Sequence, residues 1–514
     1  MRRPLAAALA ASAASWALPA AAQDCGALAG PHPGTVVITA ARSIEPGPAG
    51  WQPDTTSFYR PLPVKVPLCR VEGTIEGNIG FELWLPNADK WNRRLLGAGV
   101  GGDAGVYNYT DMSRRIGEGF ATVTTDSGHK SSQARWMADP KARVDYEHRA
   151  THLTALAAKA LAADYYAKAP DRSYFLGCSG GGRQALKEMQ LYAGDYDGVV
   201  AGAPGPYMPL ISVRMMWFSL LQKQNAAAAL TDADWDLYER ASNAACDAND
   251  GVRDGIVENP LACHFTPAQL ACAPGQASAC LPPAKVAMLT EIVAPMRNET
   301  GRIMDHGLLP GVRTRPGPPS PLLRAMWADA VYDDPAWDEN SFRRTADLDK
   351  ANAIMPELRA DSTAIAPFIK RGGKALIYQG WQDPSVIAGP TIDYYRELEA
   401  AQGGAAELAK SVRLMMVPGM YHCHGGPGAD EFGGSGQIST PANPSRDILW
   451  AVIDWVEHDR APDRIVAAKI AHGDVVLTRA LCPFPQSAHY DGVGPQDRAA
   501  SFACRIDPLL ATAR

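Results

Sequence analysis

Short apolar runs that end in turn residues recur along this chain of 514 residues. Runs of this kind are typical of strands that are buried on both faces of a sheet. We predict such strands at residues 94–98, 120–124, 173–176, 197–201, 374–378 and 412–417. Stretches with helical spacing lie between them, including residues 151–166 and 182–192. This alternation predicts an α/β fold with a mostly parallel sheet.

The strand pattern stops near Pro204 and resumes near Lys374. The intervening segment holds four of the ten cysteines and many Trp and Pro residues. We interpret residues 206–360 as an inserted lid domain, with the core formed by residues 23–205 and 361–514. The alternative is a separate packing domain, but ligands of α/β proteins bind outside the strand ends, where a lid would lie.

The first 22 residues have the pattern of a secretory signal peptide. Two arginines precede the apolar run Leu5–Leu18, and Ala20-Ala21-Ala22 offers a cleavage site. The run is too short to span a bilayer, and no later run approaches that length. We therefore expect an exported protein, periplasmic or secreted, rather than one with an uncleaved membrane anchor.

The charge pattern limits the partners of the protein. Net charge is −6, and no basic stripe appears along the chain. Nucleic acid and anionic membrane surfaces are therefore poor partner candidates. These features do not indicate an oligomeric state.

An even number of cysteines in an oxidising compartment predicts disulfides, here five from ten cysteines. Their order along the chain suggests the pairs Cys25–Cys69, Cys178–Cys423, Cys246–Cys263, Cys272–Cys280 and Cys482–Cys504. Among these, Cys178–Cys423 would close by far the longest loop.

Ser179 is the candidate nucleophile. Gly177-Cys178-Ser179-Gly180-Gly181 fits the nucleophile-elbow pattern G-x-S-x-G between a predicted strand and a predicted helix. A Gly-rich helix start is the alternative. If Cys178 and Cys423 are bonded, their Cα atoms lie within roughly 4.4–6.8 Å. Ser179 and His422, their neighbours in sequence, would then approach hydrogen-bonding range.

His422 is the candidate general base, in a Gly-rich loop after the strand at residues 412–417. His424 competes with it, but the tethered Cys423 favours His422. Asp383 is the candidate acid of a Ser-His-Asp triad, because it follows the strand at 374–378 and lies between Ser179 and His422 in sequence. Asp383 could instead serve only an Asp-Pro turn. Asp393 is the second candidate for the acid.

Two backbone N–H groups are needed to hold the oxyanion of such a reaction. One is expected from Gly180, the residue after the nucleophile. The other is expected from the turn at residues 99–102, from Gly101 or Gly102, because glycine lets the backbone approach a substrate closely. These glycines could instead serve only the turn.

An acidic loop in the predicted lid is a candidate calcium site. Side chains of Asp247, Asp250 and Asp254 and the carbonyls of Val252 and Ile256 could supply oxygen ligands. The spacing differs from that of an EF-hand, and a solvated acidic turn explains it equally well. Cys246 and Cys263 flank the loop, which suits a preformed structural site.

These residues resemble a known family. Cys178-Ser179, Asp383 and His422-Cys423 are similar to the CS-D-HC motif of the tannase/feruloyl esterase family. The resemblance covers nearly the whole chain after residue 22. It implies an α/β-hydrolase core with a large inserted lid, structural Ca²⁺ in the acidic loop and no organic cofactor. It also implies hydrolysis of aromatic acid esters such as gallates and ferulates. Mono(2-hydroxyethyl) terephthalate hydrolases look similar too.

Candidates for the substrate pocket are less specific. Trp327, Tyr332 and Trp337 could stack on an aryl acyl group, or could form the core of the lid. Gln379 lies four residues before Asp383, where relatives can carry a histidine. A terephthalate monoester would need a cation for its free carboxylate. Arg313, Arg315 and Arg324 are the candidates, and none is favoured.

We therefore expect a secreted serine esterase that cleaves phenolic acid esters through an acyl-enzyme. Hydrolysis of a terephthalate monoester is the second hypothesis. A serine peptidase or acyltransferase on the same fold is a further alternative. The remaining alternative is a binding module that has lost catalysis, against which the complete Ser-Asp-His set argues.

Overall fold

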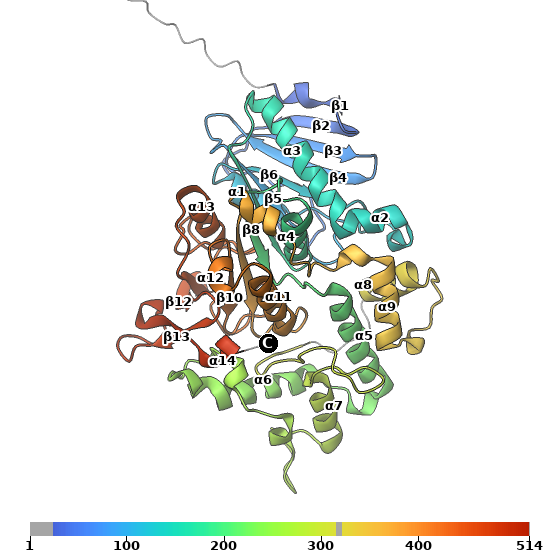
Figure 1. Cartoon of the computed structure of the whole chain (residues 1–514), viewed down its shortest axis with the longest axis vertical. Helices are drawn as coiled ribbons and strands as arrows, with labels where there is room; N and C mark the ends of the chain where they lie inside the picture. The colour runs from blue at the N-terminus through green and yellow to red at the C-terminus, as the bar shows by residue number, and fades with distance from the viewer. Residues whose placement is uncertain (1–23, 315–320, 513–514) are drawn as a thin grey trace, which may run out of the picture.

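The computed structural model describes residues 24–314 and 321–512, so the predicted signal peptide and Arg315 lie outside the described residues. Its centre is one ten-stranded sheet with the order β1-β2-β3-β4-β6-β5-β7-β8-β9-β10 (Figure 1). The sheet is antiparallel from β1 to β6 and parallel from β6 to β10. The predicted α/β fold is confirmed.

The strands of the large sheet are β1 (Gly30–His32), β2 (Val36–Ile44), β3 (Leu68–Ile75), β4 (Ile79–Pro86), β5 (Arg94–Ala98), β6 (Ala121–Thr125), β7 (Arg172–Cys178), β8 (Gly198–Gly202), β9 (Lys374–Gly380) and β10 (Val412–Val417). The six predicted strands correspond to β5–β10, within two residues at each end. Two small antiparallel sheets follow, β11 (Ile465–Ala471) with β12 (Asp474–Leu481) and β13 (Gln486–Tyr490) with β14 (Phe502–Ile506).

The α-helices are α1 (Tyr109–Ile116), α2 (Pro140–Val144), α3 (Ala150–Tyr166), α4 (Gly180–Leu191), α5 (Met208–Gln224), α6 (Asp232–Cys246), α7 (Pro283–Val293), α8 (Pro321–Ala325), α9 (Arg344–Ile354), α10 (Ala366–Lys370), α11 (Ala388–Ala401), α12 (Ala405–Leu408), α13 (Ile448–His458) and α14 (Pro508–Thr512). Two π-helical segments occupy Asp145–Arg149 and Met326–Val331. The two predicted helices correspond to α3 and α4.

Both faces of the parallel strands are buried, which explains their continuous apolar runs. Along β7, Leu176 packs in one cluster with Trp455 of α13. Phe175, the residue before it, packs in another cluster with Met189 of α4 and Leu398 of α11. Each large apolar side chain buried in this way contributes roughly 1.5–3 kcal/mol. Helices on both faces therefore fix the carboxyl ends of the strands relative to one another.

The antiparallel strands β1–β4 were not predicted from the sequence. β2 lies near the sheet edge and buries only Val36 and Ile38, so its pattern is mostly polar. β4 is buried at every position but directly follows a turn and contains Glu82. In both strands the local pattern differs from the apolar runs of the parallel strands.

The described chain between β8 and β9 consists of helices joined by irregular stretches, and it contributes no strand to the large sheet. Its helices α5–α9 gather at one end and side of the core (Figure 1). The predicted lid domain at 206–360 falls within this segment, and its role as a lid stays a prediction. Across the described residues, no helix is both long and apolar enough to cross a bilayer.

All five predicted disulfides are confirmed. Cα–Cα distances range from 4.8 Å in Cys272–Cys280 to 6.0 Å in Cys178–Cys423. The other pairs are Cys25–Cys69, Cys246–Cys263 and Cys482–Cys504.

Candidate active site

Ser179 occupies the sharp turn between β7 and α4. Its backbone has φ 61° and ψ −124°, a strained conformation that costs about 1–3 kcal/mol. Glycines make the turn possible: a methyl group on Gly177 would lie 2.4 Å from the carbonyl oxygen of Gly181, and one on Gly182 would lie 2.1 Å from that of Gly202. The motif therefore forms a strand–turn–helix elbow that places Ser179 at the carboxyl end of β7.

Asp383 orients His422. The Nδ1 atom of His422 lies 2.7 Å from Oδ2 of Asp383, a carboxylate that is fully buried. The other carboxylate oxygen accepts hydrogen bonds from the backbone N–H groups of Ser385 and Val386. With Nδ1–H donated to Asp383, the Nε2 atom is left to accept a proton.

The two influences on the pKa of His422 oppose each other. Burial lowers the pKa, since the charged ring loses solvation. The negative charge and the hydrogen bond of Asp383 outweigh burial and raise the pKa above 6.5. The imidazolium that forms during catalysis is thereby stabilised.

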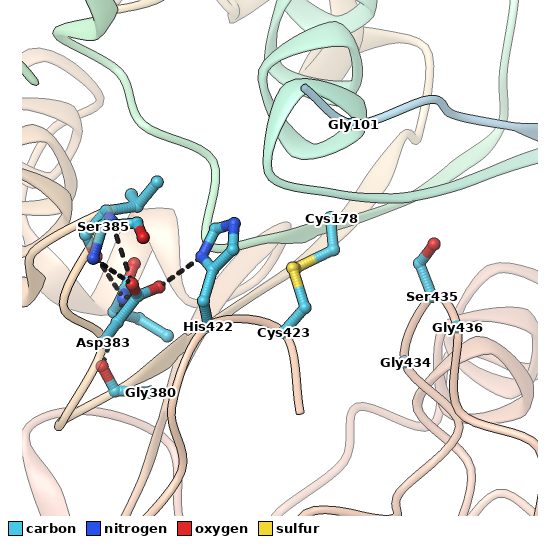
Figure 2. Close-up of a disulfide and its surroundings, with 12 residues drawn as sticks. Gly101, Cys178, Gly380, Asp383, Ser385, His422, Cys423, Gly434, Ser435 and Gly436 are labelled. Carbon is cyan, nitrogen blue, oxygen red and sulfur yellow. Dashed lines mark hydrogen bonds and ion pairs between the residues drawn. A yellow bond between two sulfur atoms is a disulfide. The ribbon is translucent and has the colours of Figure 1, made fainter. Parts of the chain in front are cut away.

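A disulfide joins the nucleophile turn to the histidine loop. Cys178 and Cys423 are bonded, and the ring of His422 lies between Asp383 and this bond (Figure 2). Ser179 and His422 line one cavity of about 170 Å³. The structure thus brings together the three residues that the sequence analysis proposed as a triad.

The competing residues lie elsewhere. His424 is exposed at the surface. Asp393 is on α11, and its carboxylate lies 2.6 Å from the ring of His306. Neither side chain lines the cavity as the described residues form it.

The glycine turn after β5 lies directly on the nucleophile elbow. A methyl group on Gly180 would lie 3.0 Å from the carbonyl oxygen of Val100 and 3.2 Å from that of Gly102. Gly102 and Gly180 line the cavity. The N–H of Gly101 instead donates to the hydroxyl of Tyr59 at 2.7 Å, so this amide is already in use. Of the two glycines considered from sequence, the geometry favours Gly102.

The rest of the cavity wall is largely apolar. Met208, Ile211 and Met215 of α5, Leu323 of α8 and Val386 after Asp383 contribute to it. These residues were not predicted from the sequence. The spacing i, i+3, i+7 of the three residues on α5, just after the end of β8, was a signal that could have found the helical part.

The aromatic candidates for substrate stacking pack against one another and against the inserted segment. Trp327 is fully buried and contacts Phe342 edge-on. Tyr332 and Trp337 stack with ring centroids 5.4 Å apart. None of the three lines the cavity at Ser179 in the described part of the chain, because they pack in or against a cluster that this segment shares with residues of the first part of the core, such as Trp136.

Gln379 supports the acid loop instead of facing the cavity. Its side chain is fully buried at the end of β9. The amide nitrogen donates to the carbonyl of Val386 at 2.8 Å and contacts the Asp383 carboxylate at 3.4 Å. The amide oxygen accepts from Thr391. Gln379 was predicted as a tentative substrate contact. In the structure it instead contacts the loop that carries Asp383.

The arginines considered for a terephthalate carboxylate are paired within the protein. Arg313 lies 2.8 Å from Asp236, and Arg324 lies 3.1 Å from Glu339. Neither lines the cavity among the described residues. Arg315 lies outside the described residues.

The acidic loop has the oxygen chemistry of a hard-cation site. Oδ2 of Asp250 is buried and has no hydrogen-bond partner among the described residues. Burial raises the pKa of Asp250 to about 6, and Asp254 and Asp247 add to this. Arg479 donates to Asp254 and would compete with an ion. No cluster of three or more His, Cys, Asp or Glu in the described ranges is arranged to hold a metal, so an ion would depend on backbone carbonyls.

Comparison with known proteins supports the chemistry of this site. A family model described as tannase and feruloyl esterase matches residues 64–310 and 323–505. An uncharacterized esterase of Xanthomonas campestris pv. campestris is 33% identical over 86% of this chain and 84% of its own. A probable feruloyl esterase B-2 of Aspergillus flavus is 31% identical, over 82% and 84% of the two chains. The crystal structure of feruloyl esterase B from Aspergillus oryzae is 27% identical, with a TM-score of 0.85 over 92% of this chain and 97% of that one.

Proposed function

The chain belongs to the tannase and feruloyl esterase family and is a carboxylic ester hydrolase, and from this premise we propose that it cleaves esters of small aromatic acids with Ser179 as the nucleophile. Feruloyl, galloyl and related phenolic esters are the expected substrates. The observation that carries the proposal is the cavity shared by Ser179 and His422, with Asp383 hydrogen-bonded behind the histidine.

The reaction follows from the roles of these groups. Oγ of Ser179 attacks the ester carbonyl while Nε2 of His422 accepts its proton. The N–H groups of Gly102 and Gly180 hold the oxyanion. Collapse of the tetrahedral intermediate expels the alcohol, which takes the proton from His422. Water, activated by the same histidine, then releases the aromatic acid from the acyl-enzyme.

The preference for an aromatic acyl group rests on the size and lining of the cavity. Its volume of about 170 Å³ compares with the roughly 150 Å³ of an apolar cavity that binds benzene. Met208, Ile211 and Met215 supply flexible apolar contacts, and thioethers pack favourably against aromatic rings. A terephthalate monoester ranks lower, because Arg313 and Arg324 are paired elsewhere and Arg183, which lines the cavity, donates to the carbonyls of Tyr146 and Glu147.

We expect Ser179→Ala to lower kcat by about 10⁴-fold or more while the protein stays folded, because the nucleophile is lost. The measurement is kcat/KM for the wild type and the variant on methyl gallate, methyl ferulate, mono(2-hydroxyethyl) terephthalate and an aliphatic ester. Circular dichroism and the Tm serve as folding controls.

Each result on this panel has a defined meaning. Retained activity in Ser179→Ala would refute the nucleophile. Equal activity on the aliphatic and aromatic esters would refute the acyl preference. A preference for the terephthalate ester would establish the second hypothesis.

We also propose that the protein works in the periplasm or outside the cell. Five disulfides and no free cysteine among the described residues fit an oxidising compartment. The signal-like pattern of the first 22 residues supports export.

We further propose that the loop at residues 247–256 binds structural Ca²⁺. The unpartnered Oδ2 of Asp250 supports this, since a buried carboxylate oxygen without a partner is costly. We expect the purified protein to contain about one calcium and chelation to lower its Tm by several degrees, because an ion that binds only the folded state stabilises it.

The matched variants are Asp250→Asn, expected to lose the calcium, and Asp232→Asn at the exposed start of α6, expected to keep it. Metal analysis and thermal unfolding measure both. Purified protein without calcium, or a Tm that is unchanged by chelation and by added Ca²⁺, would contradict the proposal.

A further inference from the structure

The turn that carries Gly102 is held by hydrogen bonds on almost every backbone group. Gly99 donates to Leu176 and accepts from Asn108, and the N–H of Val100 donates to the side chain of Gln184. The carbonyl of Gly101 accepts from the N–H of Ala104 at 3.2 Å. Among the described residues, the N–H of Gly102 is the donor of this turn that has no acceptor.

Two tyrosine hydroxyls hold the peptide groups on either side of that free donor. Tyr59 accepts a hydrogen bond from the N–H of Gly101 at 2.7 Å. Tyr146 donates to the carbonyl of Gly102 at 2.9 Å. Both side chains are buried, and burial raises the pKa of each hydroxyl, so both stay protonated. The peptide between Gly101 and Gly102 therefore lies between two anchored neighbours.

The sequence of the turn explains why anchoring is needed. Glycine on both sides gives this peptide group unusually free torsions, so rotating it costs little. In a trans peptide the N–H and the preceding C=O point in opposite directions. A rotation that broke the Gly101–Ala104 hydrogen bond would therefore also change the direction in which the Gly102 N–H points.

We propose that Tyr59 and Tyr146 are positioning residues that hold the Gly101–Gly102 peptide in the orientation in which Gly102 donates to the oxyanion. This inference rests on the proposed function, in which Ser179 and the Gly102 amide take part. Tyr146 also lines the cavity, but its hydroxyl proton is donated to the Gly102 carbonyl, so both hydroxyls act through the backbone of Gly101 and Gly102.

The two tyrosines come from distant parts of the chain. Tyr59 lies in the segment between β2 and β3, and Tyr146 lies in the π-helical segment Asp145–Arg149. Arg183, one turn after Ser179 on α4, donates to the carbonyls of Tyr146 and Glu147 at 3.0 and 2.5 Å. The helix that follows the nucleophile thus also fixes the segment that carries Tyr146. This contact links the nucleophile elbow to the turn that carries Gly102.

The test compares Tyr59→Phe, Tyr146→Phe and the double variant with Tyr166→Phe. These changes keep the ring and remove only the hydroxyl. Tyr166 is the matched control, because its hydroxyl also donates to a backbone carbonyl, that of Pro86 at 2.7 Å, at the end of α3. We expect kcat to fall about 3- to 10-fold in each single variant and about 10- to 100-fold in the double variant, with KM changed less than about twofold.

A second readout reports on the oxyanion site alone. Phenylboronic acid forms a tetrahedral adduct with a reactive serine, so its affinity depends on the oxyanion donors. We expect its inhibition constant to weaken in proportion to kcat across the variants, while inhibition by the free product acid stays unchanged. A general loss of structure would weaken both.

The outcomes separate this inference from the proposed function. If Ser179→Ala stays active, the proposed function fails. If Ser179→Ala is inactive but kcat is unchanged in the double variant, only the tyrosine inference fails. A rise in KM at constant kcat would show that the hydroxyls bind substrate, and would also overturn it. An equal loss in Tyr166→Phe would assign the effect to stability and overturn it as well.

Discussion

At the scale of single residues, the two ring nitrogens of His422 have different surroundings. Nδ1 faces the buried carboxylate of Asp383, which is itself fixed by the N–H groups of Ser385 and Val386. This arrangement sets both the orientation of the ring and its affinity for a proton. The histidine must be neutral to accept the proton of Ser179.

We expect kcat/KM to fall as the pH is lowered through the pKa of His422, with a midpoint above 6.5 because Asp383 raises that pKa. Protonation removes the base, so a raised pKa moves the loss of activity to higher pH. Asp383→Asn removes the group that raises the pKa and leaves burial, which lowers it. The midpoint should therefore shift to lower pH, and kcat should fall about 10⁴-fold.

The measurement is the pH profile of kcat/KM for the wild type, Asp383→Asn and the control Asp393→Asn. Asp393 contacts His306 and not His422, so its profile should match the wild type. A wild-type midpoint below 6.5, or a shift in the control that equals the one in Asp383→Asn, would contradict this account of His422.

At the scale of elements, the site depends on a strand, a turn and a helix joined to a distant loop. β7 delivers Ser179 and α4 begins directly after it, while the loop after β10 delivers His422. The bond between Cys178 and Cys423 links residues 245 apart in sequence. It therefore constrains both the unfolded chain and the distance between the two loops.

We expect the double variant Cys178→Ala/Cys423→Ala to unfold with a free energy lower by about 5 kcal/mol on the loop-entropy model. We also expect its kcat to fall roughly 10- to 100-fold, because the serine and histidine loops lose their tether. Urea unfolding and steady-state kinetics at 25 °C measure the two effects.

Cys272→Ala/Cys280→Ala is the control. This bond joins cysteines only 8 residues apart in sequence, and neither cysteine lines the cavity as the described residues form it. Its removal should cost about 2–3 kcal/mol and leave kcat unchanged. An unchanged kcat in the Cys178/Cys423 variant would show that the packing of the two loops suffices without the bond.

At the scale of the whole molecule, buried ion pairs join the two parts of the core that the inserted segment separates. Asp447 precedes α13, and its fully buried carboxylate lies 2.6 Å from Arg114 and 2.9 Å from Arg115 of α1. The same carboxylate accepts a hydrogen bond from the N–H of Leu449 at the start of α13. One side chain thus fixes a helix of the second part against a helix of the first.

We expect Asp447→Asn to lower the free energy of unfolding by up to about 3–5 kcal/mol, because Arg114 and Arg115 lose a fully buried counter-charge and keep only that of Glu118. An asparagine can still cap α13, so the effect reports the charge. Activity per folded molecule should be unchanged. Urea unfolding monitored by fluorescence measures the stability.

Asp463→Asn provides the comparison. The side chain of Asp463 is 97% exposed and lies 3.3 Å from Arg413, so its loss should cost at most about 1 kcal/mol. Equal losses in the two variants would contradict a role for Asp447 in joining the two parts of the core.

The sequence by itself determined the features that depend on neighbouring residues. Burial of both faces of a strand produces a continuous apolar run, so β5–β10 were predictable, whereas the edge strand β2 and the mixed strand β4 were not. The order of the cysteines suggested one set of five pairs, and the structure confirms it. The spacing around Ser179, and the cysteines next to Ser179 and His422, pointed to the residues that the structure brings together.

Only the tertiary structure decided which side chains face the cavity. Trp327 and Met215 are both apolar residues of the inserted segment, yet packing buries the first inside a hydrophobic cluster and leaves the second at the edge of that cluster, in the cavity wall. Likewise, Gly101 and Gly102 are equivalent in sequence, and Tyr59, distant in the chain, engages the amide of one of them. Such choices depend on contacts between residues far apart in the chain, which local periodicity does not encode.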